Sequence, residues 1–133
     1  MPFLPITALY TAFLAILLIV LAYQVVLQRL KNKEGLGHTH KNLVLAGRNH
    51  ANAAEYIPIA IFLLGLAEIN GASGFLLHAC GATLFCSRLA HAWGFKRGRG
   101  MTHSGRYWGT VGTWLVILFM SGLNVFYVWP YLF

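Results

Sequence analysis

The sequence predicts an all-α membrane protein, a bundle of four transmembrane helices. Only 10% of its 133 residues are charged and 58% are hydrophobic, whereas soluble domains carry about 25% charged residues. Uncharged stretches cover residues 1–28, 56–67, 69–87 and 107–133. A helix needs about 20 mostly apolar residues to cross a bilayer core. Two clear spans and two that polar residues interrupt therefore give four helices, expected at 5–29, 44–69, 73–95 and 105–129 in one domain, 1–133.

The first helix is expected to remain in the mature protein. Its apolar core, residues 6–27, is longer than the roughly 7–15 residues of a signal-peptide core, and it has neither a basic segment before it nor a small-residue cleavage site after it. The second helix follows a basic loop and ends at the Asn70-Gly71 turn, after which the third begins. The order of elements is thus helix, basic loop, helix, tight turn, helix, basic loop, helix.

The fourth helix carries small residues at every fourth position, Gly105, Gly109 and Thr113. Such a ladder lets a neighbouring helix approach closely in lipid. The neighbour can belong to the same subunit or to another subunit, and the sequence leaves both alternatives open.

The basic residues act as topology signals. Nearly all Lys and Arg lie in two short segments, RLKNKEGLGHTHK and KRGRGMTHSGR, and none lies at the termini. The positive-inside rule places both loops in the cytoplasm and both termini on the periplasmic side. The net charge of +7 does not indicate nucleic-acid binding, because the cations do not line a soluble face.

Cysteine and histidine give no sign of a metal site. Cys80 and Cys86 are six residues apart, which puts them on different faces of one helix, so both are expected to be free, buried thiols. A haem or metal site built from His50, His78 and His91 is disfavoured because His78 lies near the opposite membrane face.

A stripe of polar residues lies near the start of the second helix. Arg48, Asn52 and Glu55 fall within about 60° of one another on a helix, so they face protein or water and not lipid. The third helix carries Arg88 and His91 on one face. Glu55 and Arg88 lie at similar depths, about 10–12 Å from the basic loops at 1.5 Å per residue. They are therefore predicted to form an ion pair within the subunit.

This polar set is either a structural ion pair that joins two helices or a ligand site. Arginines from all four helices converge on the cytoplasmic end, with only Glu55 as an internal counter-ion. They are Arg29, Arg48, Arg88 and Arg106. The surplus of positive charge favours a small ligand with several carboxylates, since guanidinium groups hold carboxylates in bidentate fashion. Apolar helix walls would receive a lipophilic partner from the membrane.

The stretch RNHANAAEYIPI resembles the second-helix signature of the MAPEG family, the membrane-associated proteins of eicosanoid and glutathione metabolism. The signature reads approximately R-x-x-x-N-x-x-E-(Y)-x-P, and Arg48, Asn52, Glu55, Tyr56 and Pro58 match it at the same spacings. The resemblance continues through AYQVVLQR, SRLAHAWGF and an arginine at the start of the fourth helix. It is strongest to the short bacterial inner-membrane members.

The resemblance implies a homotrimer that binds glutathione between subunits near the cytosolic face. The implied activity is that of an integral membrane transferase or peroxidase acting on lipophilic electrophiles. Arg106 is the implied thiol-activating residue, with Arg97 and Arg99 as alternatives. The implied glutathione contacts or their supports are Arg29, Arg48, Asn52, Glu55, Arg88 and His91. His91 and Phe95 stand where the eicosanoid-forming members have tyrosines.

An alternative from another class is a non-enzymatic four-helix membrane protein, either a small exporter or a ligand-binding relic of the family. Composition and the number of spans permit it. An exporter of cations is expected to place an unpaired carboxylate at mid-membrane. The predicted pairing of Glu55 with Arg88 argues against that.

Overall fold

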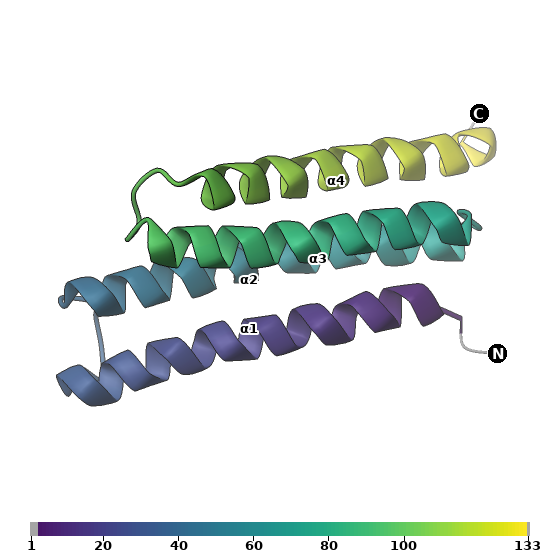
Figure 1. Ribbon diagram of the computed structural model, residues 1–133. Helices are drawn as coiled ribbons and strands as arrows, with labels where there is room; N and C mark the ends of the chain where they lie inside the picture. Colours follow the sequence, from purple (N-terminus) through teal and green to yellow (C-terminus); the bar gives the residue numbers. More distant parts are fainter. Residues whose placement is uncertain (1–2, 133) are drawn as a thin grey trace.

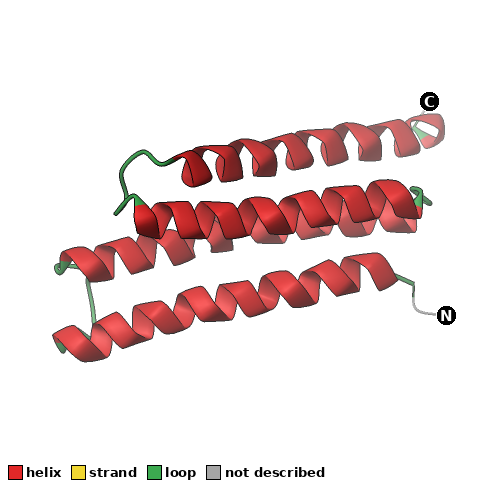
Figure 2. Ribbon diagram, viewed as in Figure 1, coloured by secondary structure: helices red, strands yellow, loops and turns green. Residues whose placement is uncertain are grey.

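The computed structural model describes residues 3–132, which form an antiparallel bundle of four long α-helices (Figure 1). The helices are α1 (Pro5–Asn32), α2 (Lys41–Ile69), α3 (Gly74–Arg97) and α4 (Ser104–Val128), and a 3₁₀ turn, η1 (Trp129–Tyr131), follows α4. The described residues form no strand, and short loops join the helices (Figure 2). The predicted all-α, four-helix architecture is confirmed.

The two ends of the bundle differ in chemistry. Loops 33–40 and 98–103 lie together at one end, which we call the basic end, whereas both chain termini and the turn 70–73 lie at the other, the terminal end (Figure 1). At the terminal end, the Glu68 carboxylate accepts hydrogen bonds from the backbone N–H groups of Ile6 (2.9 Å) and Thr7 (2.7 Å). Glu68 on α2 therefore satisfies unpaired donors in the first turn of α1.

The helix bounds differ from the expected ones by at most three residues. α1 continues to Asn32 and ends where Lys33 adopts a left-handed conformation, with φ of 53°. α2 begins at Lys41 rather than residue 44. Side chains cap the other two helices, since Ser73 Oγ accepts from Leu76 N and His103 Nδ1 accepts from Gly105 N.

α2 and α3 form the centre of the bundle. Each contacts all three other helices, whereas α1 and α4 do not contact each other within residues 3–132. The core between the helices is aliphatic, and Leu14, Leu64, Leu84 and Met120 are at most 2% exposed. The outer faces of α1 and α4 expose many large apolar side chains, as expected for surfaces that face lipid.

The small-residue ladder of α4 packs on α3. A Cβ added to Gly109 would overlap the backbone of His91 and Ser87, and Gly94 on α3 approaches the backbone of Gly105 equally closely. Thr113 is fully buried and donates its hydroxyl to the Gly109 carbonyl at 2.8 Å. Of the two alternatives, the ladder therefore serves packing within the subunit.

α3 differs from its neighbours in composition. α1, α2 and the stretch Ser104–Tyr131 are long and apolar enough to cross a membrane, and α3 does not reach the same hydropathy. α3 carries Arg88 and His91, both buried. It also carries both cysteines, which are free. Cys80 is buried as predicted, but Cys86 is exposed, because it lies on the outer side of α3.

Candidate anion-binding site

A cavity of about 450 Å³ opens at the basic end between α2, the end of α3 and the start of α4. The 98–103 loop also contributes to its lining. The residues that line it are Lys41, Leu45, Arg48, Asn52, His91, Phe95, Arg99, Gly100, Met101 and Arg106. Its volume lies within the range of about 300–1,000 Å³ that is typical of small-molecule sites.

The charge of this cavity is strongly one-sided. Lys41, Arg48, Arg99 and Arg106 provide four cationic side chains, and the described residues that line the cavity include no carboxylate. Asn52 adds a neutral amide. Clustered cations of this kind repel one another unless an anion joins them, and guanidinium groups bind carboxylates in bidentate geometry. The cavity is therefore suited to a small molecule with more than one carboxylate.

A fifth cation, Arg88, lies behind the cavity wall. It is only 2% exposed, and its Nη1 donates to Asn52 Oδ1 at 2.9 Å while Nη2 donates to the Gly109 carbonyl at 3.4 Å. Its guanidinium carbon lies 5.6 Å from the centre of the Tyr56 ring. All these partners are neutral, so Arg88 orients Asn52 and adds positive charge next to the cavity.

The predicted ion pair between Glu55 and Arg88 is wrong. Among residues 3–132 the only salt bridge joins Glu34 to His40 in the 33–40 loop. Arg88 reaches Asn52 instead, whereas Glu55 is exposed one turn further along α2. The two residues do lie at similar depths along the bundle. Glu55, however, points to the side of α2 that faces α4.

Glu55 lies in an apolar groove between α2 and α4. The groove is lined by Glu55, Tyr56, Ile59, Trp114, Ile117 and Leu118. It begins one helical turn beyond Asn52, which lines the cationic cavity. A polar cavity and an apolar groove are thus adjacent along the same side of α2.

Arg106 is the third residue of α4 and lines the cationic cavity. Its Nη1 donates to the carbonyls of Gly100 and Met101, and its guanidinium carbon lies 4.7 Å from the centre of the Phe95 ring. Arg106 therefore holds the 98–103 loop while it presents positive charge to the cavity. The first turn of α4 adds the partial positive charge of a helix N-terminus.

Arg29 does not reach this cavity. Its Nη1 donates to the carbonyls of Glu34, Gly35 and Gly37, the shortest distance being 2.9 Å to Gly35. The same loop is held by Glu34, whose pKa is lowered to about 2 by hydrogen bonds from the His40 side chain and the Thr39 backbone. Within the described chain, Arg29 is thus a support of the 33–40 loop.

The structure brings four of the predicted site residues together around the cavity, Arg48, Asn52, His91 and Arg106. Arg88 stands behind Asn52, Glu55 lies in the adjacent groove, and Arg29 lies elsewhere.

Sequence reasoning missed Lys41 because the second helix was expected to begin at residue 44. Lys41 precedes Arg48 by seven residues, a spacing that puts both on one helix face, so the signal was present. Of the two alternative arginines, Arg99 lines the cavity and Arg97 packs on Trp93, 6.0 Å from the ring centre.

Comparison with known proteins agrees with this architecture. The model of the MAPEG family matches residues 7–126. Inner membrane protein YecN of Escherichia coli strain K12 is 36% identical over 124 residues, which cover 92% of each chain. The protein of the same name from Escherichia coli O6:H1 matches to the same extent.

Proposed function

Because the chain belongs to the MAPEG family, we propose that it is an integral inner-membrane enzyme that uses glutathione to conjugate or reduce lipophilic electrophiles. One observation carries the proposal: a cavity whose described lining residues include four cations and no carboxylate adjoins an apolar groove between α2 and α4. Glutathione carries two carboxylates, one ammonium group and a thiol, so its carboxylates and its net negative charge are complementary to the cationic cavity. The apolar groove would receive the electrophile.

The thiol step follows from the position of Arg106. A free thiol with a pKa of about 8.5 is only a few per cent ionised at neutral pH, and the thiolate is the nucleophile. The guanidinium of Arg106 and the N-terminus of α4 both favour the ionised sulfur. In a transferase the thiolate attacks the electrophilic carbon and displaces the leaving group. In a peroxidase it attacks a peroxide oxygen, the O–O bond breaks and the alcohol leaves. The resulting sulfenic acid then reacts with the thiol of a second glutathione to give the disulfide and water.

The polar stripe supports a homotrimeric assembly. Arg48 and Glu55 are exposed in the single chain although both lie on a helix that is apolar enough to cross the membrane. Exposed charges at such positions are costly in lipid and are normally covered by protein or water. A second copy that packs over this face of α2 would cover the stripe and complete the glutathione site. In this proposal the basic end is cytoplasmic and the terminal end periplasmic.

Calorimetry with glutathione on the purified protein in detergent tests the proposal most directly. We expect saturable binding, and Arg48→Gln should weaken it because that arginine lines the cavity and forms no hydrogen bond or salt bridge within residues 3–132. Arg97→Gln is the matched control, since Arg97 packs on Trp93 outside the cavity. Absence of binding at millimolar glutathione would refute the proposal.

A second candidate, a small exporter, is favoured by one observation. Glu55 forms no hydrogen bond or salt bridge within residues 3–132 and lies in the apolar groove. An unpaired carboxylate on a membrane helix is typical of proton-coupled transport sites. Proton-coupled efflux of a lipophilic cation from vesicles, lost in Glu55→Gln and unaccompanied by conjugating activity, would support the exporter over the enzyme.

A further inference from the structure

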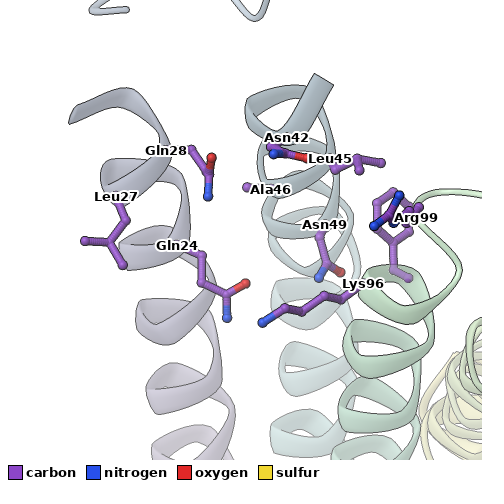
Figure 3. A pocket seen from close by; sticks show the side chains of 10 residues that line it. Gln24, Leu27, Gln28, Asn42, Leu45, Ala46, Asn49, Lys96 and Arg99 are labelled. Carbon is purple, nitrogen blue, oxygen red and sulfur yellow. The ribbon is translucent and has the colours of Figure 1, made fainter. Parts of the chain in front are cut away.

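A second cavity, of about 370 Å³, lies at the basic end between α1, α2 and the end of α3 (Figure 3). It is separate from the candidate glutathione site, although Leu45, Phe95 and Arg99 line both. Its other lining residues are Gln24, Leu27, Gln28, Asn42, Ala46, Asn49 and Lys96. Nothing in the proposed function uses this cavity.

Carboxamides with unpartnered oxygens line the α1 and α2 sides of the cavity. Asn49 is only 4% exposed, and its Nδ2 donates to the Ala92 carbonyl at 3.1 Å, whereas its buried Oδ1 has no hydrogen-bond partner within residues 3–132. The buried Oε1 of Gln28 also lacks a partner in the described part of the chain. Buried polar atoms are normally hydrogen-bonded. Both oxygens are buried and unpaired, so a ligand that carries N–H or O–H donors can satisfy them when these carboxamides turn toward the cavity.

The α3 side of the cavity is cationic. The Lys96 side chain extends from α3 toward α1 (Figure 3), and Arg99 lies at the rim next to the first cavity. No carboxylate is found among the described residues that line it, and neither cation takes part in a salt bridge within residues 3–132. The ligand should therefore carry an anionic group as well as hydrogen-bond donors.

We propose that this cavity binds the headgroup of a phospholipid whose phosphodiester bears an N–H or O–H donor, such as phosphatidylethanolamine or phosphatidylglycerol. The cavity lies at the basic end of the bundle, where two of the helices that line it, α1 and α2, are long and apolar enough to cross a membrane. Headgroups are found at this level, and basic pockets between membrane helices bind them. Leu27 lines the cavity and is 44% exposed, and Val20 and Tyr23 continue an exposed stripe along α1. An acyl chain can lie along that stripe while the phosphate meets Lys96.

The test compares lipids that share a phosphodiester but differ in donors. The delipidated protein in detergent is mixed with phosphatidylethanolamine, phosphatidylglycerol or phosphatidylcholine of equal chain length, and retained lipid is counted by native mass spectrometry. The choline headgroup has no N–H or O–H donor. We expect retention of the first two lipids to exceed that of phosphatidylcholine by about tenfold, the ratio that one strong net hydrogen bond supplies. Equal retention of all three lipids would overturn the proposal.

Two variants separate the contributions of charge and of the amide. Lys96→Gln should lower retention of all three lipids, whereas Lys31→Gln, which removes an exposed charge from the last turn of α1 outside the cavity, should not. Gln28→Leu should remove the preference for donor headgroups. An identical effect of Lys96→Gln and Lys31→Gln would overturn the assignment. Competition by soluble glycerophosphate or phosphoethanolamine as strong as by the lipids would support the same chemistry with a free phosphate ester as its source.

Discussion

The hydrogen bond between Asn52 and Arg88 is expected to contribute measurably to the free energy of unfolding. Arg88 is 2% exposed, and its hydrogen bond to Asn52 Oδ1, at 2.9 Å, is shorter than the one to the Gly109 carbonyl. The change Asn52→Leu keeps a similar volume but removes this acceptor. The guanidinium then retains the 3.4 Å contact to the Gly109 carbonyl and the Tyr56 ring. Hydrogen bonds to charged groups contribute about 1.5–3 kcal/mol, so we expect a loss of about 2 kcal/mol in the free energy of unfolding.

Glu55→Gln is the matched control for this prediction. Glu55 lies three residues further along the same helix and is not bonded to Arg88. We expect it to change the free energy of unfolding by less than about 0.5 kcal/mol, as for surface substitutions. If Glu55 paired with Arg88, its removal would instead cost about 3–5 kcal/mol.

Unfolding of both variants is measured by titration with a denaturing detergent in mixed micelles, without glutathione. A large loss in Glu55→Gln together with little change in Asn52→Leu would refute the reasoning.

Three further predictions concern the basic end and the contact between α3 and α4. Arg106→Ala should cut turnover with a reactive aryl halide by about tenfold at pH 7, and the loss should shrink above the thiol's own pKa of about 8.5; Arg97→Ala should keep full turnover. Gly109→Ala should lower the free energy of unfolding by about 1–3 kcal/mol because the new methyl group overlaps α3. Gly122→Ala is the control and should not lower it, because its methyl group meets open space. Unfolding in denaturing detergent measures both variants. Glu34 should titrate near its lowered pKa of about 2 rather than near 4.5. Its hydrogen bonds in the 33–40 loop are therefore complete above about pH 4.5 and are lost as the pH falls through 2. A carboxyl NMR titration with a midpoint near 4.5 would contradict this prediction.

The sequence was sufficient for the helices because their signal is local. Long apolar runs and the Asn70-Gly71 turn locate each span without knowledge of its neighbours. The helix ends were less predictable. α1 ends at Asn32 because Lys33 adopts a left-handed conformation. Lysine does not favour that conformation, so the sequence does not predict it.

The site was partly predictable for a related reason. Periodicity correctly placed Arg48 and Asn52 on one face of a helix, and both line the cavity. The hydrogen-bond acceptor of Arg88 depends on the rotation of α2 and α3 about their axes and on their crossing angle. The depth of a residue along its helix determines neither the rotation nor the crossing angle. Arg99 lies in the 98–103 loop, and its own φ is 47°. Its place at the rim of both cavities follows from the path of that loop, which no periodic pattern in the sequence predicts.

The composition of α3 has a consequence for how the protein is made. α3 is the described helix that does not reach the hydropathy of a membrane span, yet it has contacts with every other helix. A single arginine near the middle of a span opposes insertion by about 2.5–3.5 kcal/mol. Within residues 3–132, the hydrogen-bond acceptors of the Arg88 side chain lie on α2 and α4. During synthesis α2 emerges before α3, but α4 emerges after it. Stable insertion of α3 should therefore wait for α4, so a chain that ends before Ser104 should leave the α3 segment poorly inserted in a translation and glycosylation-mapping assay.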